Sequence, residues 1–263
     1  MKYTNYILGL CLGTMLVVTS CETLDIELTD NPNALSPSQA DPGFFLNAIQ
    51  VDFAYWVHSM GDRTGELTRI NYMSGRNYDN IYSPDSWNGL WSSAYRGMLE
   101  DIRLMNLIAE ERGLQFEIGM GKVFQSYIML TLVDQFGSVP YSEALQGSEG
   151  NLNPISDDGA SIYSAAIALL DSAVADFNAG SLASSSNDFF YGGNSSKWIK
   201  AANSIKKKAL LNTGDTAGYN AISNYITTAA DDFEFQWGTN QATPDTRHPL
   251  YRSNYTCLLY TSP

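Results

Sequence analysis

Residues 121–137, GKVFQSYIMLTLVDQFG, decide how the rest of the chain can fold. Apolar side chains occur nearly all round this stretch at helical spacing, which is typical of a helix that is buried on every side. The helix is expected to stop at Gly137, which can take a positive φ, and Pro140 fixes the exit. A helix of this kind needs amphipathic helices around it, and the flanking sequence supplies them.

Helical patterns occur on both sides of this central stretch. Upstream, apolar residues recur every three or four positions in 44–60 and in 87–113, and Arg112 and Gly113 provide a C-terminal charge and cap. Downstream, we predict helices at 154–180 with Ser156 as N-cap, at 196–212 behind Ser195 or Ser196, and at 216–233. No stretch has a convincing strand pattern. The sequence therefore predicts an all-α fold with tetratricopeptide-like helix pairs, although no repeat of about 34 residues is visible.

The N-terminus has the pattern of an export signal. Lys2 precedes an uncharged apolar run from Ile7 to Val18, which is far shorter than the roughly 20 residues that span a bilayer. The run ends in VVTSC, which resembles a lipobox whose Cys21 thiol carries diacylglycerol. We predict a signal peptide at 1–20 and a lipidated tether at 21–43, rich in Asp, Asn, Pro and Ser. The alternative is a buried apolar helix that contains a cysteine.

Composition excludes several classes of protein. Beyond position 21 the chain carries 28 acidic residues, and only Lys2 of its 15 basic residues lies before that point. This excess of negative charge argues against binding to nucleic acid and against direct docking on anionic lipid head groups. Cys11, Cys21 and Cys257 leave no internal pair for a disulfide and no cluster for a metal. His58 and His248 are far apart in sequence, and we expect them to be isolated.

The sequence also lacks the motifs of common catalytic sites. It has no nucleophile elbow, no HExxH, no phosphate-binding loop and no dinucleotide fingerprint. We therefore expect neither an enzyme nor a cofactor. The tail CLLYTSP at 257–263 follows no turn or helix pattern, and its possible codons resemble a transposon-type sequencing adapter. We expect this tail not to be protein-derived and the gene to continue beyond Thr256, so that this chain is an N-terminal part. The alternative is an ordinary C-terminus.

Several stretches together resemble one protein family. They are LTLVDQFGSVPYSEAL (130–145), SPDSWNGLWSSAYRGMLEDI (83–102), SIYSAAIALLDSAVADF (161–177), DFFYGGNSSKWIKAANSIKKKALLN (188–212) and DNPNAL (30–35). In this order and behind a lipobox, they resemble the SusD/RagB family of outer-membrane glycan-binding lipoproteins, in its SusD-like, starch-binding-associated branch. The resemblance implies a SusD-type helical domain at 44–256, incomplete at its C-terminus. It implies a lipid-anchored protein at the cell surface that captures oligosaccharides for a TonB-dependent (SusC-like) outer-membrane transporter.

The loop at 74–88 is the candidate binding site. It lies where some family members place binding aromatics, and sugars need flat aromatic faces together with hydrogen-bonding groups. Candidate ligand contacts are Trp87, Tyr82 and Tyr78 for stacking, with Asn88, Asp79 and Arg76 for hydrogen bonds. Tyr82 and Trp87 can also simply pack on the helix that follows. The rival function is a lipid-anchored helical-repeat scaffold that binds proteins rather than glycans.

Overall fold

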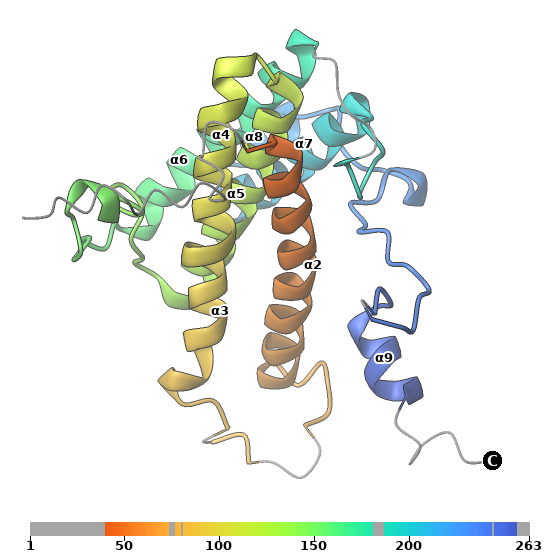
Figure 1. Ribbon diagram of the computed structural model, residues 1–263. Coiled ribbons are helices and arrows are strands. Elements are labelled where there is room, and N and C mark those ends of the chain that lie inside the picture. The colour runs from red at the N-terminus through yellow and green to blue at the C-terminus, as the bar shows by residue number, and fades with distance from the viewer. Residues whose placement is uncertain (1–39, 74–76, 80, 181–186, 244, 257–263) are drawn as a thin grey trace, which may run out of the picture. The chain divides into compact units, whose positions relative to one another are not determined.

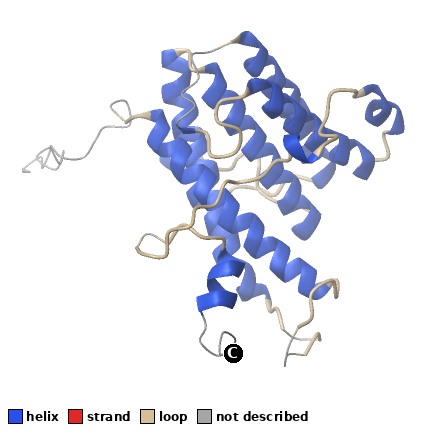
Figure 2. Cartoon of the chain, turned by 90° about the vertical axis from the view of Figure 1, so that its right-hand side faces the viewer, coloured by secondary structure: helices blue, strands red, loops and turns tan. Residues whose placement is uncertain are grey.

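A computed structural model describes residues 40–73, 77–79, 81–180, 187–243 and 245–256. Within these residues all regular structure is helical (Figures 1 and 2), apart from an isolated antiparallel bridge between Val139 and Asp157. The all-α prediction is confirmed. The predicted signal peptide, Cys21, most of the tether and the tail at 257–263 lie outside the described residues.

The helices follow one another along the chain with connections of very different lengths. They are α2 (Pro42–Leu67), η3 (Pro84–Trp87), α3 (Asn88–Ser92), η4 (Ser93–Leu99), α4 (Glu100–Arg112), α5 (Gln115–Phe136), η5 (Gly147–Glu149), α6 (Gly159–Ala179), α7 (Ser195–Asn212), α8 (Thr216–Ala221), η7 (Ala229–Asp231) and α9 (Pro249–Thr256). Helix α5 is in contact with α2, α4, α6 and α7. It is therefore the central buried helix that the sequence predicts, although it begins six residues earlier, at Gln115.

Two glycines explain how α5 stays central. A Cβ added at Gly119 would lie 2.9 Å from the Phe177 ring, so the missing side chain lets α6 approach closely. At the far end, Gly137 has φ 78° and stops the helix as predicted. By length and composition α6 is the one described helix that could cross a membrane, but it packs against α5 and α7 as a core helix would.

Helices α2 and α4 run beside each other and cover one side of α5 (Figure 1). The predicted helix at 44–60 is longer in the structure. It begins at Pro42, because the Asp41 carboxylate accepts a hydrogen bond from the Gly43 N–H at 2.9 Å. The predicted helix at 87–113 is one run that contains a π-helical segment, η4, and ends at Gly113 with φ 67° as expected.

The N-cap predicted for α6 is wrong. The cap is Asp158, whose carboxylate accepts from the Ser161 N–H at 3.0 Å, rather than Ser156. The reason lies in the corner after α5. Asp157 accepts from the N–H groups of Tyr141 and Ser142 at 2.9 and 2.8 Å, which keeps the chain extended up to Asp158.

The N-cap of α7 also differs from the prediction. It is Asn194, not Ser195 or Ser196, and its side chain accepts from the Lys197 N–H at 3.1 Å. Just before this cap, the buried carboxylate of Asp188 stabilises the turn that leads into α7. It accepts from the backbone N–H groups of 190, 191 and 193 and from the indole N–H of Trp198 at 2.8 Å. The predicted core position of Trp198 is confirmed, since its side chain is fully buried.

The predicted helix at 216–233 is mostly wrong. Only α8 and the short 3-10 turn η7 form within it, and the chain is otherwise irregular up to an extended segment at 232–237. The Nζ of Lys207 donates to the carbonyl oxygens of Tyr219 and Ile222 at 2.7 and 3.2 Å and lies over the rings of Tyr219 and Tyr225. These tertiary bonds occupy carbonyls that a longer helix would use itself. Helix α9 was not expected from the sequence.

Candidate functional site

The five predicted ligand contacts that the structure describes do not all line one cavity. Arg76 lies outside the described residues. The Tyr78 ring lies 4.9 Å from the guanidinium carbon of Arg69, and the Asp79 N–H donates to Asn77. Neither Tyr78 nor Asp79 lines the cavity that the remaining three candidates share.

Tyr82, Trp87 and Asn88 do come together. They line a cavity of about 510 Å³, called here the Trp87 cavity. Its full lining is Leu67, Tyr82, Pro84, Trp87, Asn88, Trp91, Gln135 and Phe136. It lies where the end of α2, the start of α3 and the end of α5 meet.

Neighbouring side chains hold the aromatic rings of the Trp87 cavity in place. The Tyr82 and Trp87 centroids are 5.8 Å apart, and Trp87 meets Phe136 edge to face at 5.6 Å. The Arg63 guanidinium carbon lies 5.6 and 5.5 Å from the centroids of Tyr82 and Trp87. The Tyr82 hydroxyl donates to Glu66 of α2. Trp87 also packs against the hydrophobic core, so it supports the fold and lines the cavity at once.

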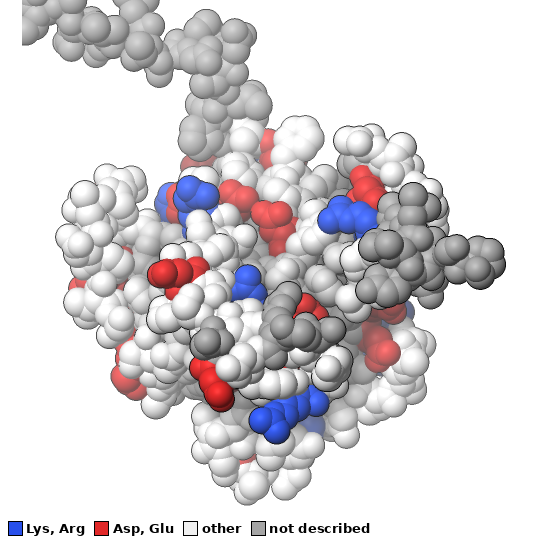
Figure 3. All heavy atoms as spheres, turned by 90° about the horizontal axis from the view of Figure 1, so that it is seen from below, with Lys and Arg blue, Asp and Glu red and all other residues white. Residues whose placement is uncertain are grey.

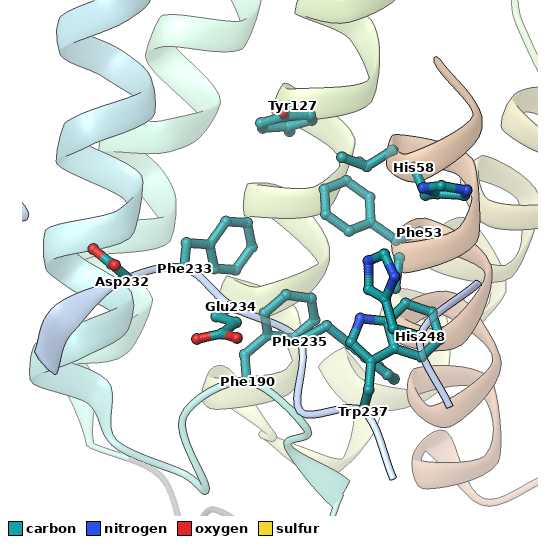
Figure 4. A pocket seen from close by; sticks show the side chains of 12 residues that line it. Phe53, His58, Tyr127, Phe190, Asp232, Phe233, Glu234, Phe235, Trp237 and His248 are labelled. Carbon is teal, nitrogen blue, oxygen red and sulfur yellow. The ribbon is translucent and has the colours of Figure 1, made fainter. Parts of the chain in front are cut away.

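The structure contains a second cavity, of about 570 Å³, which the sequence analysis did not predict. It is called here the Trp237 cavity (Figure 4). Its lining is Phe53, Ala54, Val57, His58, Tyr127, Phe190, Asp232, Phe233, Glu234, Phe235, Trp237 and His248. These residues come from α2, α5, the turn before α7, the extended segment 232–237 and the residue before α9.

The extended segment forms the aromatic wall of this cavity. In FEFQW, at 233–237, the three aromatic side chains are half-buried and the residues between them are exposed, as the period of two in an extended chain dictates. Phe233 stacks on Phe190 with centroids 4.6 Å apart, and Phe235 meets Trp237 at 4.8 Å. The Gln236 N–H donates to the Phe189 carbonyl at 3.1 Å, which fixes the segment along the turn. The alternation of aromatic residues in 233–237 could have predicted this wall, but the helix predicted at 216–233 ran into its first residue.

His58 and His248 are not isolated, contrary to the sequence-based expectation. Their ring centroids lie 5.5 Å apart at the wall of the Trp237 cavity, and His248 also meets Trp237 at 5.2 Å. The pKa of His58 is lowered by burial and by His248, while Asp62 acts in the opposite direction. Packing of the segment before α9 against α2 brings the two rings together, which no local sequence pattern reveals.

Acidic residues line the Trp237 cavity, and no lysine or arginine does. Asp232 and Glu234 are its charged lining residues apart from the histidines, and neither makes an ion pair within the described residues. Elsewhere, the face in Figure 3 shows charged side chains scattered among uncharged ones. The described residues hold no group of three or more His, Cys, Asp or Glu that could bind a metal ion.

Both cavities can hold a flat polar ligand. Aromatic faces stack on the apolar side of a sugar ring, and amide, hydroxyl and carboxylate groups bond its hydroxyls. The Trp87 cavity offers Asn88 and Gln135 beside its rings. The Trp237 cavity offers Asp232 and Glu234.

Several solved structures with this fold are SusD homologs or SusD/RagB family proteins. A SusD/RagB family protein from Bacteroides thetaiotaomicron has a TM-score of 0.66 and 21% identity, covering 76% of this chain and 46% of its own. A SusD homolog from Parabacteroides distasonis has a TM-score of 0.64 and 18% identity, covering 82% and 46%. One from Bacteroides uniformis has a TM-score of 0.63 and 18% identity, covering 83% and 49%. This chain therefore spans less than half the length of these proteins.

Sequence comparison gives the family. A search of curated proteins finds no match. The family model SusD-like_2, described as "Starch-binding associating with outer membrane", matches residues 32–256. That span includes every described helix and both cavities. The chain therefore belongs to the SusD-like family.

Proposed function

We propose that this chain is the capture region of a cell-surface lipoprotein that binds oligosaccharides and delivers them to a TonB-dependent outer-membrane transporter. No bond is made or broken in this role. The lipid on Cys21 holds the protein at the outer membrane, and the helical domain presents the ligand site. The family description names starch binding and association with the outer membrane, which supports this role.

One observation carries the glycan-binding part of the proposal. In a SusD-like chain, Tyr82, Trp87 and Asn88 of this loop line one cavity. A sugar ring would stack on Trp87 or Tyr82, while Asn88 and Gln135 bond its hydroxyls. The contacts of Arg63 with both rings fix their positions before a ligand arrives, which lowers the entropic cost of binding.

The test is binding of a glycan array, followed by calorimetry with the strongest ligand. Trp87→Ala should weaken binding by about 1–2 kcal/mol, a typical loss for an aromatic contact together with its buried area. Tyr72→Ala is the matched control, because Tyr72 is 84% exposed and lines no described cavity. Trp87→Phe keeps a ring and should retain most of the affinity.

Two outcomes would contradict this proposal. Unchanged affinity in Trp87→Ala would remove the Trp87 cavity as the site. A protein that binds no glycan but co-purifies with other cell-surface proteins would favour the helical-repeat scaffold. Co-purification with a barrel transporter, lost when Cys21 is replaced, would support delivery from a membrane-anchored position.

A further inference from the structure

We propose that the Trp237 cavity is a second saccharide site, separate from the Trp87 cavity, and that it takes uncharged sugar rings in preference to acidic ones. This inference rests on the proposed glycan-binding function. The linings of the two cavities have no residue in common.

The wall of the Trp237 cavity is preformed for stacking. Phe233, Phe235 and Trp237 project from one side of the extended segment (Figure 4). Phe190 supports Phe233 from one end, and Tyr55 meets Trp237 edge to face at 5.1 Å at the other. Rings held in this way lose little conformational freedom when a pyranose lies on them.

Polar groups stand where sugar hydroxyls would need partners. Asp232 and Glu234 line the cavity and are exposed at its rim, on either side of Phe233. Carboxylates accept hydrogen bonds from hydroxyls strongly.

The charge of the rim gives the selectivity. No lysine or arginine lines the cavity. Nearby cations have partners of their own. Lys200 pairs with Asp231 at 2.7 Å, Arg247 pairs with Asp245 at 2.8 Å, and Lys197 donates to the Ala230 carbonyl oxygen at 2.6 Å. A uronate or sulfated sugar would therefore meet Asp232 and Glu234 without a compensating cation, and like charges repel.

The experiment is calorimetry on the purified full chain with trisaccharides, which are too short to favour bridging of the two cavities. Maltotriose, mannotriose and xylotriose are the neutral probes, and trigalacturonate is the acidic probe. The wild type should bind two molecules of a neutral probe and none of the acid. Trp237→Ala and Trp87→Ala should each reduce the stoichiometry to one, or weaken one site about tenfold.

A variant that gains binding is also needed, because a variant can lose binding merely through damage to the fold. Asp232→Asn with Glu234→Gln removes both rim charges and keeps the side-chain shapes, so trigalacturonate should now bind at the Trp237 cavity. Glu111→Gln with Glu149→Gln removes the same charge at exposed positions away from the cavity and should leave the acid unbound. Phe235→Ala, as a second wall variant, should reproduce the loss seen with Trp237→Ala.

The outcomes separate this inference from the proposed function. One neutral site that survives Trp237→Ala and Phe235→Ala but is lost in Trp87→Ala overturns the second site and leaves the function standing. Binding of trigalacturonate by the wild type at the Trp237 cavity, or no gain in the Asp232→Asn, Glu234→Gln variant, overturns the selectivity. A wild type that binds none of the four probes overturns both.

Discussion

The imidazole rings of His58 and His248 meet edge to face, with their centroids 5.5 Å apart. One comes from the middle of α2 and the other from the residue before α9. Burial lowers the pKa of His58 first, and the neighbouring His248 lowers it further. The contact therefore joins the residue before α9 to a group of α2 whose pKa is shifted.

The first prediction follows from the lowered pKa of His58, caused first by burial and then by His248. The unfolded chain takes up the proton at a higher pH, near the ordinary histidine pKa of 6.5. Stability is therefore fully present above that value and is lost as the pH falls through it toward the folded pKa. Between about pH 7.5 and 5.5, the wild type should lose more in melting temperature than His58→Gln. Parallel pH profiles for the two proteins would contradict this.

The second prediction concerns Asp188, which accepts four N–H groups and is 6% exposed. Asp188→Ala leaves those donors buried without a partner and should lower the free energy of unfolding by about 3 kcal/mol. Asp188→Asn keeps one acceptor oxygen and should cost less. Chemical denaturation measures both. Equal losses in the two variants would contradict this expectation, because Asp188→Asn opens no cavity and retains an acceptor oxygen.

The third prediction concerns Lys207, whose side chain is enclosed by Tyr219 and Tyr225. Lys207→Met keeps the apolar stem but removes the charge and both bonds to carbonyl oxygens, so we expect a loss of about 2 kcal/mol. Hydrogen exchange should rise in 216–228, the segment that Lys207 holds. Lys208→Met is the control, because the Lys208 side chain is 68% exposed. A uniform rise along the whole chain would argue against a local role.

The fourth prediction concerns export. Cys21→Ala should abolish lipidation, since only a thiol can carry the thioether-linked lipid, and leave the precursor uncleaved or released from the membrane. Labelling cells with a fatty-acid probe measures this. Cys11→Ala is the matched control, because Cys11 lies inside the predicted signal peptide. Label that persists in Cys21→Ala would refute the lipobox.

Features set by local interactions could be predicted. The apolar pattern of 121–137 identified the central helix because a helix buried on all sides needs apolar residues all round. Gly113 and Gly137 marked helix ends because positive φ favours glycine. Caps were less predictable. Asp158 and Asn194 replaced the expected serines because several neighbouring side chains could cap, and the path of the chain selects one of them.

The candidate site, too, could be predicted only in part. Sequence alone placed Tyr82, Trp87 and Asn88 in one loop, and the structure shows them lining one cavity, whereas Tyr78 lies elsewhere beside Arg69. The sequence determined the long helices from α2 to α7, because amphipathic periodicity is a local property. Only the tertiary structure decided where the Trp237 cavity lies. Lys207 ends the helix begun at α8, the extended segment then turns its aromatic rings against α2, and His248 reaches His58 through contacts between distant parts of the chain.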